Sequence, residues 1–323
     1  MAFSSGIGTY IREIVPYFLG SPFRTVLLVD QPGSPWCKEF DQIAFKAPVY
    51  SIREQLLYPL KIPSVDLFWS PHYNVPLLPI RAAKRIVTIH DVCHLALGSG
   101  LQKFYAKSVM GFALRRSDKA ITVSQFSKRE IEKYLGLGPL EMIPIGVNAA
   151  RFSAQSGSDW DLVRKKYRLP DRFVLFVGNN KPHKNLKRLA RAFTQVNIPG
   201  LELVMAGQGT PTGPVEERDL PVLYRMAEAF VFPSLYEGFG LPPLEAMASG
   251  CPTAVSRAAS MPEVCGDGSL YFDPTNEEEM ARAIREAVGN LPLVERGFAR
   301  VKQLNWEKTA ASHIQVFEEV CCA

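Results

Sequence analysis

The sequence predicts an α/β protein with two doubly wound parallel sheets, and three observations support that prediction. Short runs of β-branched and apolar residues alternate with helical patterns along the whole chain. Several of these runs are apolar throughout, which is typical of parallel strands covered on both faces. The chain has 323 residues, enough for two domains of about 150 residues each.

The expected strands fall in both halves of the chain. In the first half they are 25–30, 66–70, 85–90, 119–124 and 141–145, and in the second 172–178, 201–207, 229–233 and 252–256. A last helical pattern over 306–320 places Ala310, Ile314 and Phe317 on one face. The small polar residues 153–159 predict a hinge, so we expect domains at 1–152 and 172–304, a linker at 153–171 and a closing helix at 305–323.

The chain starts unusually for an open α/β domain. Gly6-Ile7-Gly8 follows only five residues, whereas a glycine-rich turn of this kind normally follows a first strand. The next segment, 10–18, has a helical pattern. The sequence therefore predicts a first domain that lacks its first strand, through a clipped or misassigned start.

Composition excludes several classes of protein. Hydrophobic residues make up 47% and charged residues 21%, which is typical of a globular chain and not of a disordered one. The longest charge-free run, 67–80, is interrupted by prolines and is shorter than the roughly 20 apolar residues of a spanning helix. With no export signal and no CxxC among 6 cysteines, the sequence predicts a cytoplasmic protein with reduced thiols.

The charge is uneven. Residues 1–150 hold 17 Lys and Arg against 11 Asp and Glu, whereas the remainder holds 20 against 21. A basic half fits nucleic acid, an anionic membrane or an acidic substrate, and equally an ordinary solvated surface. The basic residues are scattered and no aromatic recognition motif accompanies them, so no nucleic acid is expected as a partner.

The strongest candidate site is 233–250, PSLYEGFGLPPLEAMASG. A strand leads into a loop with Gly238 and Gly240, and prolines open a helix whose N-terminal amides and dipole attract anions. Glu237 in the loop and Glu245 in the first helical turn would repel a phosphate. We therefore expect them to bind hydroxyl groups, of a sugar and of a ribose respectively. The alternative is a capped helix whose glutamate favours the dipole.

A second candidate is 173–186, FVLFVGNNKPHKNL. An apolar strand ends at Gly178, and a short loop brings Lys181, His183 and Lys184 to the start of a helix. A lysine there opposes the helix dipole, which indicates a bound anion such as a diphosphate. A solvated surface lysine is the alternative.

Three weaker signals complete the set. Gly207 and Gly209 end the next strand, at the edge where open α/β sheets bind ligands. His90 ends a strand and His94 follows, but no third ligand accompanies them, so no metal site is predicted. Ser124 is predicted to cap the helix that begins near residue 125.

Taken in order, these motifs resemble the retaining glycosyltransferases of family 4, of the GT-B fold and the bacterial surface-polysaccharide type. The resemblance implies two Rossmann-like domains facing across a cleft. The second would hold the nucleotide sugar, the first would face the acceptor, and the closing helix would cross back to the first. The matching segments are GIG (6–8), VTIHD (87–91), ITVSQFSKREI (121–131), IPIGVNAARF (143–152), VGNNKPHKNL (177–186), MAGQG (205–209), EGFGLPPLE (237–245) and VCGDGSLYFDP (264–274).

The resemblance also implies roles for single residues. Glu237 would contact the donor sugar, Lys184 the diphosphate, and His90 the reacting face of the sugar, which makes these three the catalytic set. The donor-binding set would be Gly6, Gly8, Gly178, Lys181, His183, Gly207, Gly209, Gly238, Phe239, Gly240, Leu241 and Glu245. Many members carry arginine where this chain has Asn179 and His183, a departure that implies either weaker phosphate binding or binding that rests on Lys181. No metal and no cofactor are expected.

The function that the resemblance implies is transfer of a hexose, mannose or similar, from a GDP- or UDP-linked donor to a saccharide acceptor. The leaving β-phosphate oxygen would take the acceptor's proton, and Lys184 would stabilise the departing charge. The segment 101–119 mixes apolar residues, Phe104 and Tyr105 among them, with lysines and arginines. It fits either an anionic membrane surface or a core-facing helix with a basic outer face. We expect a lipid-linked acceptor at the cytoplasmic side of a membrane, in surface polysaccharide or lipopolysaccharide assembly.

Two other functions fit the same residues. A sugar-nucleotide epimerase or hydrolase would alter or release the sugar without an acceptor. A non-catalytic nucleotide-sugar-binding protein would bind the donor without turnover.

Overall fold

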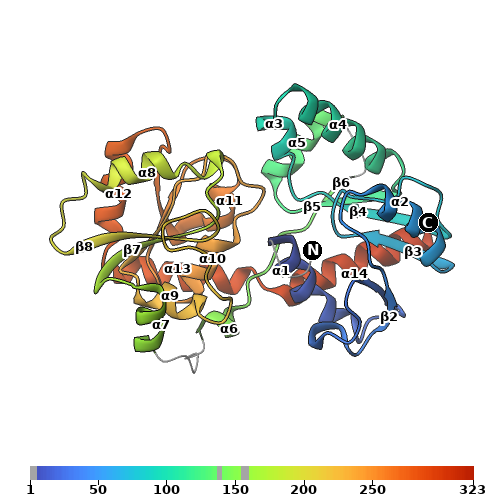
Figure 1. Cartoon of the computed structure of the whole chain (residues 1–323), viewed down its shortest axis with the longest axis horizontal. Coiled ribbons are helices and arrows are strands. Elements are labelled where there is room, and N and C mark those ends of the chain that lie inside the picture. Colours follow the sequence, from blue (N-terminus) through green and yellow to red (C-terminus); the bar gives the residue numbers. More distant parts are fainter. Residues whose placement is uncertain (1–5, 137–139, 154–159) are drawn as a thin grey trace. The chain divides into compact units, whose positions relative to one another are not determined.

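The computed structural model describes residues 6–136, 140–153 and 160–323, apart from the side chains of Leu101, Gln102 and Tyr105. The chain divides into two compact units, shown in Figure 1. The first unit comprises Met1–Gly146 and Trp306–Ala323, and the second Val147–Asn305. The helix α14 (Trp306–Cys322) therefore belongs to the first unit, although it ends the chain.

The first unit contains two parallel sheets. One has the order β3-β4-β5-β6, and the other pairs β1 with β2. The strands are β1 (Val26–Val29), β2 (Asp41–Ala44), β3 (Val65–Ser70), β4 (Ala82–Thr88), β5 (Lys119–Thr122) and β6 (Leu140–Met142). The helices before α14 are α1 (Gly6–Ile14), α2 (Ile52–Lys61), α3 (Cys93–Leu97), α4 (Gly100–Arg115) and α5 (Gln125–Leu135), with short 3-10 turns at Val15–Phe18 and Pro35–Cys37.

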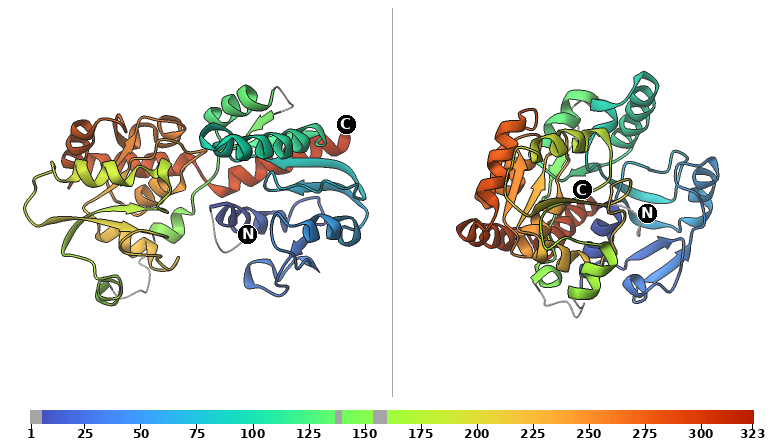
Figure 2. Two further views of the ribbon diagram at one scale, coloured as in Figure 1. Left: turned by 45° about the horizontal axis from the view of Figure 1, so that its top comes forward. Right: turned by 60° about the vertical axis from the view of Figure 1, so that its left-hand side comes forward.

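Helix α14 packs against α1, β3 and β4 of the first unit (Figure 1 and Figure 2). Inside this contact the Tyr10 hydroxyl donates a hydrogen bond to Nε2 of His313 (2.6 Å). The Nδ1 of His313 lies 2.7 Å from the Thr309 carbonyl oxygen. Because this carbonyl can only accept, Nδ1 carries the proton and Nε2 accepts. Burial lowers the pKa of His313 to about 4, so its ring is neutral at neutral pH.

The second unit holds one five-stranded parallel sheet of order β11-β10-β9-β7-β8. The strands are β7 (Arg172–Val177), β8 (Leu201–Ala206), β9 (Ala229–Phe232), β10 (Thr253–Ser256) and β11 (Ser269–Phe272). The helices are α6 (Ala149–Ser153), α7 (Trp160–Tyr167), α8 (Leu186–Phe193), α9 (Leu220–Met226), α10 (Leu241–Ala248), α11 (Met261–Cys265), α12 (Glu277–Ala287) and α13 (Leu291–Gln303), with 3-10 turns at Pro182–Lys184 and Gly266–Gly268.

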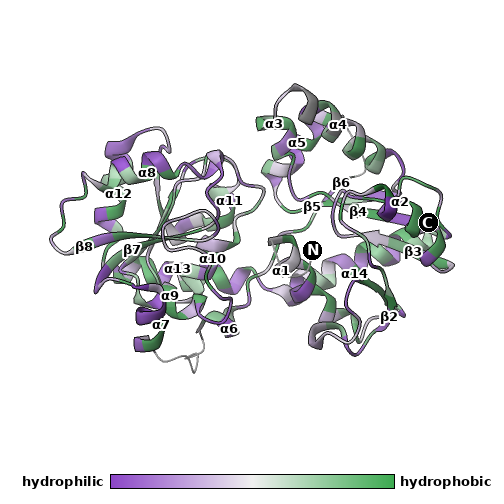
Figure 3. Ribbon diagram, viewed as in Figure 1, coloured by the Kyte–Doolittle hydropathy of each residue, from purple (hydrophilic) through white to green (hydrophobic). Residues whose placement is uncertain are grey.

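Both units bear out the predicted α/β class. Every residue of β9 and of β10 is buried, which explains why β9 is apolar without alternation; β10 buries Ala254 and Val255 between Thr253 and Ser256. By contrast, α8 and α12 alternate hydrophobic and hydrophilic residues, since one face of each is exposed (Figure 3). No helix in the part of the chain that the structure describes is long and apolar enough to cross a membrane.

The start of the chain differs from the prediction. Gly6 and Gly8 lie in the first turn of α1, not in a glycine-rich loop, and the helix predicted over 10–18 ends at Ile14, where a 3-10 turn that includes Pro16 takes over. Proline lacks an N–H and cannot continue the α-helical ladder. The prediction of a missing first strand concerns residues before Gly6, which lie outside the described ones.

Other elements also differ from those predicted. Strands β2 and β11 were not predicted, and the segment expected as a linker contains α7. The hinge expected at 153–159 falls mostly on residues 154–159, outside the described part. Ser124 caps α5 as predicted, because its hydroxyl accepts a hydrogen bond from the Ser127 N–H (3.0 Å).

Candidate functional site

The candidate site lies where the strand order of the second sheet reverses. β7 pairs with β8 on one side and with β9 on the other, so the connections that leave β7 and β9 diverge at their carboxyl ends. Ligands of open α/β sheets bind at this kind of position. The two strongest sequence motifs are these two connections, 178–185 after β7 and 233–240 after β9.

Hydrogen bonds hold the two loops together. The Leu235 N–H donates to the His183 carbonyl oxygen (2.8 Å). The side chain of Asn185 donates to the carbonyl oxygens of Pro233 (3.2 Å) and Pro274 (2.7 Å). Asn185 is buried and was not predicted as a site residue; it fixes the lysine loop against the ends of two other strand connections.

Lys184 and Glu237 form an ion pair across these loops. The Lys184 Nζ lies 2.5 Å from the Glu237 Oε1, and the two side chains are only 13% and 14% exposed. The same ammonium lies 5.1 Å from the centre of the Phe232 ring, within cation–π range. An ammonium has three N–H donors, so pairing with one carboxylate leaves donors for an anion.

Hydrogen bonds from Ser260 support the glycine-rich loop 237–240. Ser260 Oγ lies 3.0 Å from the Glu237 carbonyl oxygen and 2.9 Å from that of Phe239. Gly240 has φ +95°, and an added Cβ would lie 2.3 Å from the Met261 Cε. The positive φ favours glycine at 240, and a larger residue would also have to displace the end of the Met261 side chain. Phe239 is buried, and so is Gly238.

The N-terminus of α10 has fewer free backbone N–H groups than most helices have. The helix begins at Leu241 and continues with Pro242 and Pro243, which have no N–H. The amide donors at this end are therefore those of Gly240 and Leu241, not the usual set of four. An anion bound here would depend more on Lys184 than a proline-free helix would require.

Glu245 lies in the second turn of α10, so its predicted place in the first turn is wrong. Its Oε2 accepts a hydrogen bond from the hydroxyl of Tyr224 in α9 (2.8 Å). Burial and the neighbouring carboxylate hold the pKa of Tyr224 well above its usual value, so this hydroxyl keeps its proton and remains a donor. Tyr224 was not predicted as a site residue, because it lies in an apolar run and has the pattern of a core residue.

The close approach of β7 and β8 explains the glycine at 207, in the motif 205–209. Gly207 has φ +133°, and a Cβ there would lie 2.0 Å from the Gly178 carbonyl oxygen, so only glycine lets the ends of β7 and β8 approach. The Gly178 N–H donates to the Ala206 carbonyl (2.9 Å), closing the pair. Gly209 and Lys181 are exposed at the same edge of the sheet.

The carboxamide of Asn179, next to Gly178, was also missed by sequence reasoning. Its Oδ1 is buried and has no hydrogen-bond partner among the described residues. Buried acceptors are nearly always paired in folded proteins, and those left over indicate a missing donor. A hydroxyl or N–H group of a ligand would supply one.

His90 belongs to the first unit, two residues beyond β4. Its Nε2 lies 3.0 Å from the Pro71 carbonyl oxygen, and its ring meets the Tyr10 ring edge-on at 4.7 Å. The carbonyl accepts, so Nε2 carries the proton and Nδ1 is an acceptor. Burial lowers the pKa of His90, which keeps the ring neutral at neutral pH. No three metal-ligating side chains cluster in the described part of the chain.

Comparisons with known proteins agree with this geometry. Residues 171–290 match the family described as "Glycosyl transferases group 1", and residues 4–151 match "Glycosyltransferase Family 4". O-antigen chain mannosyltransferase B of Escherichia coli is 29% identical over 276 residues, 75% of this chain and 72% of that protein. The serotype-specific mannosyltransferase WbdA of Escherichia coli is 27% identical over 80% of this chain, which spans only 35% of its length.

Solved structures show the same fold. Sucrose-phosphate synthase from Thermosynechococcus elongatus superposes with a TM-score of 0.74 at 19% identity, over 98% of this chain and 93% of that one. WaaG, described as a glycosyltransferase involved in lipopolysaccharide biosynthesis, gives 0.72 at 14% identity, over 97% and 96%.

The two Rossmann-like units and the solved structures that they resemble define the GT-B fold, and the family matches and the curated relatives define a glycosyltransferase. Residues 4–151 match glycosyltransferase family 4 and residues 171–290 match the glycosyl transferases of group 1, so both units contain a glycosyltransferase family domain. The resemblance stated from the sequence is thereby confirmed.

Proposed function

We propose that this glycosyltransferase moves a hexose from a nucleoside-diphosphate sugar to a saccharide acceptor, with retention of the anomeric configuration, in the assembly of a surface polysaccharide. The main observation is the Lys184–Glu237 pair, which places one cation and one hydroxyl-binding carboxylate at the switch point of the nucleotide-binding sheet. Mannose is the favoured sugar, because relatives along most of this chain are named as O-antigen mannosyltransferases.

Each polar group around the pair has a place in donor binding. The remaining N–H groups of Lys184 and the amides of Gly240 and Leu241 bind the diphosphate. Glu237, next to the ammonium, accepts hydrogen bonds from the sugar hydroxyls. Glu245, held by the Tyr224 hydroxyl at 2.8 Å, accepts from the ribose diol through its other oxygen.

The chemical step breaks the bond between the anomeric carbon and the β-phosphate oxygen, and the acceptor oxygen bonds to the same carbon. The acceptor's proton passes to the departing phosphate oxygen, so charge and atoms balance. Both glutamates are engaged, Glu237 by Lys184 and Glu245 by Tyr224, so neither is placed like the free carboxylate nucleophile of a retaining hydrolase. Catalysis then depends on stabilising the leaving diphosphate with Lys184 and the helix amides. The proposal includes no metal and no cofactor.

His90 has a more limited part in this scheme. Its Nδ1 is an acceptor because Nε2 is used toward the Pro71 carbonyl. A neutral imidazole can accept a hydrogen bond from a sugar hydroxyl near the reacting carbon and thereby orient it. It does not need to take the acceptor's proton.

The acceptor that we propose is lipid-linked and is met at the cytoplasmic face of a membrane. Of the apolar residues on α4, Met110 and Ala113 are buried in the core, as the core-facing alternative predicts. Phe104, however, is 72% exposed and stands between the exposed Lys103 and Lys107. One aromatic among lysines is the pattern of a weak contact with an anionic surface. Sedimentation with anionic and neutral vesicles tests it; Phe104→Ser should reduce binding to the anionic ones only.

The decisive experiment offers GDP-mannose and UDP-glucose, each with and without a mannoside acceptor, and follows the products by NMR. An α-linked product from an α-linked donor supports retention, while an inverted linkage rejects it. Free sugar or an altered nucleotide sugar without acceptor would indicate the hydrolase or epimerase. Donor binding in a thermal-shift assay without any turnover would indicate a non-catalytic binder.

A further inference from the structure

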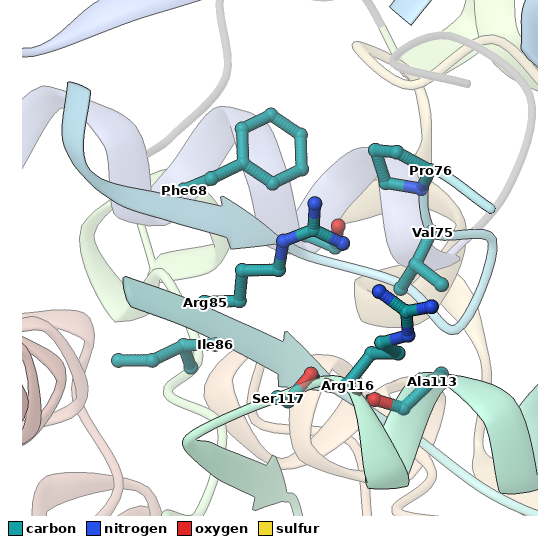
Figure 4. A pocket seen from close by; sticks show the side chains of 9 residues that line it. Phe68, Val75, Pro76, Arg85, Ile86, Ala113, Arg116 and Ser117 are labelled. Atoms are coloured by element: carbon teal, nitrogen blue, oxygen red, sulfur yellow. Dashed lines mark hydrogen bonds between the residues drawn. The ribbon is translucent and has the colours of Figure 1, made fainter. Parts of the chain in front are cut away.

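A small pocket in the first unit contains two arginines that no part of the proposed reaction uses. It lies between β3, β4 and the end of α4, with Phe68 and Pro76 among its walls (Figure 4). Arg85 comes from β4 and Arg116 from the residue that follows α4. Both guanidinium groups point into the same space in Figure 4.

Neither guanidinium group is neutralised. Within the described residues, no carboxylate forms an ion pair or side-chain hydrogen bond with Arg85 or Arg116; Arg116 only lies over the Phe112 ring, 5.2 Å from its centre. The nearby carboxylate is Asp118. Its Oδ2 accepts from the Arg85 backbone N–H (2.8 Å), and its Oδ1 lies 3.8 Å from the Lys84 Nζ.

The positive charges therefore exceed the negative ones. Lys84 and the backbone of Arg85 contact Asp118, and the charges of both Arg116 and Asp118 act on the Arg85 guanidinium. Burial and the charge of Arg116 lower the pKa of Arg85, and Asp118 opposes this shift only in part. The half-buried Arg85 guanidinium and the Arg116 guanidinium carry the same charge and repel each other. An anion bound between them would offset this repulsion.

We propose that Arg85 and Arg116 form a binding site for a phosphate monoester. Each guanidinium is a planar fork that binds two oxygens side by side, and a phosphate has enough oxygens for two forks while a carboxylate fills only one. The doubly negative phosphate also matches two unpaired positive charges. The site belongs to the first unit and is therefore separate from the Lys184–Glu237 site in the second.

The pocket has a volume of about 10 Å³, room for one water molecule. The phosphate therefore binds at its mouth, where the exposed Arg116 can swing to meet it while the half-buried Arg85 stays fixed. Pro76 leads directly to Leu77 and Leu78, which are 39% and 40% exposed. An apolar rim of this kind suits a phosphate with a hydrocarbon part, and a water-soluble phosphate ester would use the same two forks.

The test compares two neighbouring arginines: Arg115, the last residue of α4, and Arg116, the residue that follows it. Arg116→Gln removes one fork, whereas Arg115→Gln removes the same charge from an exposed side chain that lies against Gly111 of its own helix. Titration with inorganic phosphate by calorimetry should show affinity about tenfold weaker in Arg116→Gln and changed less than twofold in Arg115→Gln. Arg85→Gln should match Arg116→Gln.

Vesicles distinguish the two sources of phosphate. Phosphatidic acid presents a monoester and phosphatidylglycerol a diester, both in phosphatidylcholine. A preference for phosphatidic acid that disappears in Arg116→Gln but not in Arg115→Gln assigns the site to a lipid headgroup, and binding of free phosphate without that preference assigns it to a soluble ester. Equal phosphate affinity in the Arg115 and Arg116 variants, or none in the parent protein, would overturn the proposal. Donor binding, measured on the same variants, should not change, so failure here leaves the glycosyltransferase proposal intact.

Discussion

The Lys184–Glu237 pair gives the sharpest prediction, because its geometry fixes the size of the effect. Two unit charges 2.5 Å apart attract by about 1.7 kcal/mol in water and by about 6.6 kcal/mol at an effective dielectric constant of about 20. With side chains 13% and 14% exposed, the pair lies between these limits. We expect a coupling free energy of about 3 kcal/mol.

Four proteins measure it: the parent, Lys184→Ala, Glu237→Gln and the double variant, each unfolded in urea. Either single change leaves an unpaired buried charge and should lower the free energy of unfolding by about 2–4 kcal/mol. The double change removes both charges, so its loss should be smaller than the sum of the two by the coupling energy. The exposed pair Arg24–Asp41 at 2.8 Å, whose side chains are 87% and 54% exposed, is the control; treated identically, it should show a coupling of less than about 1 kcal/mol. Additive losses at 184 and 237 would refute the ion pair.

Turnover separates binding the diphosphate from simply stabilising the fold. Lys184→Ala should lower kcat about 10²–10³-fold, since it removes a charge that stabilises the leaving group. Lys181→Ala, in the same loop but exposed, is the matched control and should change kcat less than about threefold. A larger loss at Lys181 than at Lys184 would transfer the diphosphate role to Lys181 and reject the mechanism as written.

Three further predictions concern other parts of the chain. Gly207→Ala should lower the free energy of unfolding by roughly 2–4 kcal/mol, because the new methyl group meets the Gly178 carbonyl; an unchanged urea midpoint would contradict the contact. Tyr224→Phe removes one hydrogen bond that orients Glu245 and should raise the donor KM about fivefold with little change in kcat, whereas an equal fall in kcat would point to a role in the chemical step. Burial lowers the pKa of His313 to about 4, so on acidification the unfolded chain takes up this proton first. The free energy of unfolding should therefore fall by about 2 kcal/mol from this group between about pH 7 and pH 5, and a flat profile from urea titrations in that range would count against it.

The sequence predicted the strands that are buried on both sides and missed those that are not. β9 is a continuous apolar run and β10 has Ala254 and Val255 at its centre, and the burial of both strands explains why they could be predicted. β2 begins with Asp41 and is partly exposed along its length, so its pattern does not stand out from a loop. β11 is a short edge strand that directly follows a glycine turn.

Candidate residues could be predicted singly, but their contacts could not. Lys184 and Glu237 were each identified from a local motif, yet they lie 53 residues apart and meet only because β7 and β9 are neighbours. Ser260 and Tyr224 support the site from elements that carry no motif. Their function depends on tertiary contacts alone, which no local pattern records.

Helix α14 shows the limit of hydropathy as a guide. The apolar pattern placed Ala310, Ile314 and Phe317 on the buried face, but Ile314 is only partly buried while His313 is fully buried. The histidine is tolerated there because both ring nitrogens have partners, the Tyr10 hydroxyl and the Thr309 carbonyl. A hydropathy scale assigns a polar ring to the surface, since it does not include the hydrogen bonds that burial supplies.

The prolines of α10 support the role that we propose for Lys184. A proline-free helix would present four amides to a diphosphate, but Pro242 and Pro243 remove two of them and leave those of Gly240 and Leu241. A side chain then has to supply the positive charge that the two missing amides would have offered to the diphosphate. Lys184, in the loop after β7, is the candidate, and Glu237 in the loop before α10 pairs with it. Glu237 balances that charge in this structure. In the mechanism that we propose, the diphosphate becomes the second anion on the ammonium when the donor binds, and Glu237 keeps the lysine in place while it accepts hydrogen bonds from the sugar.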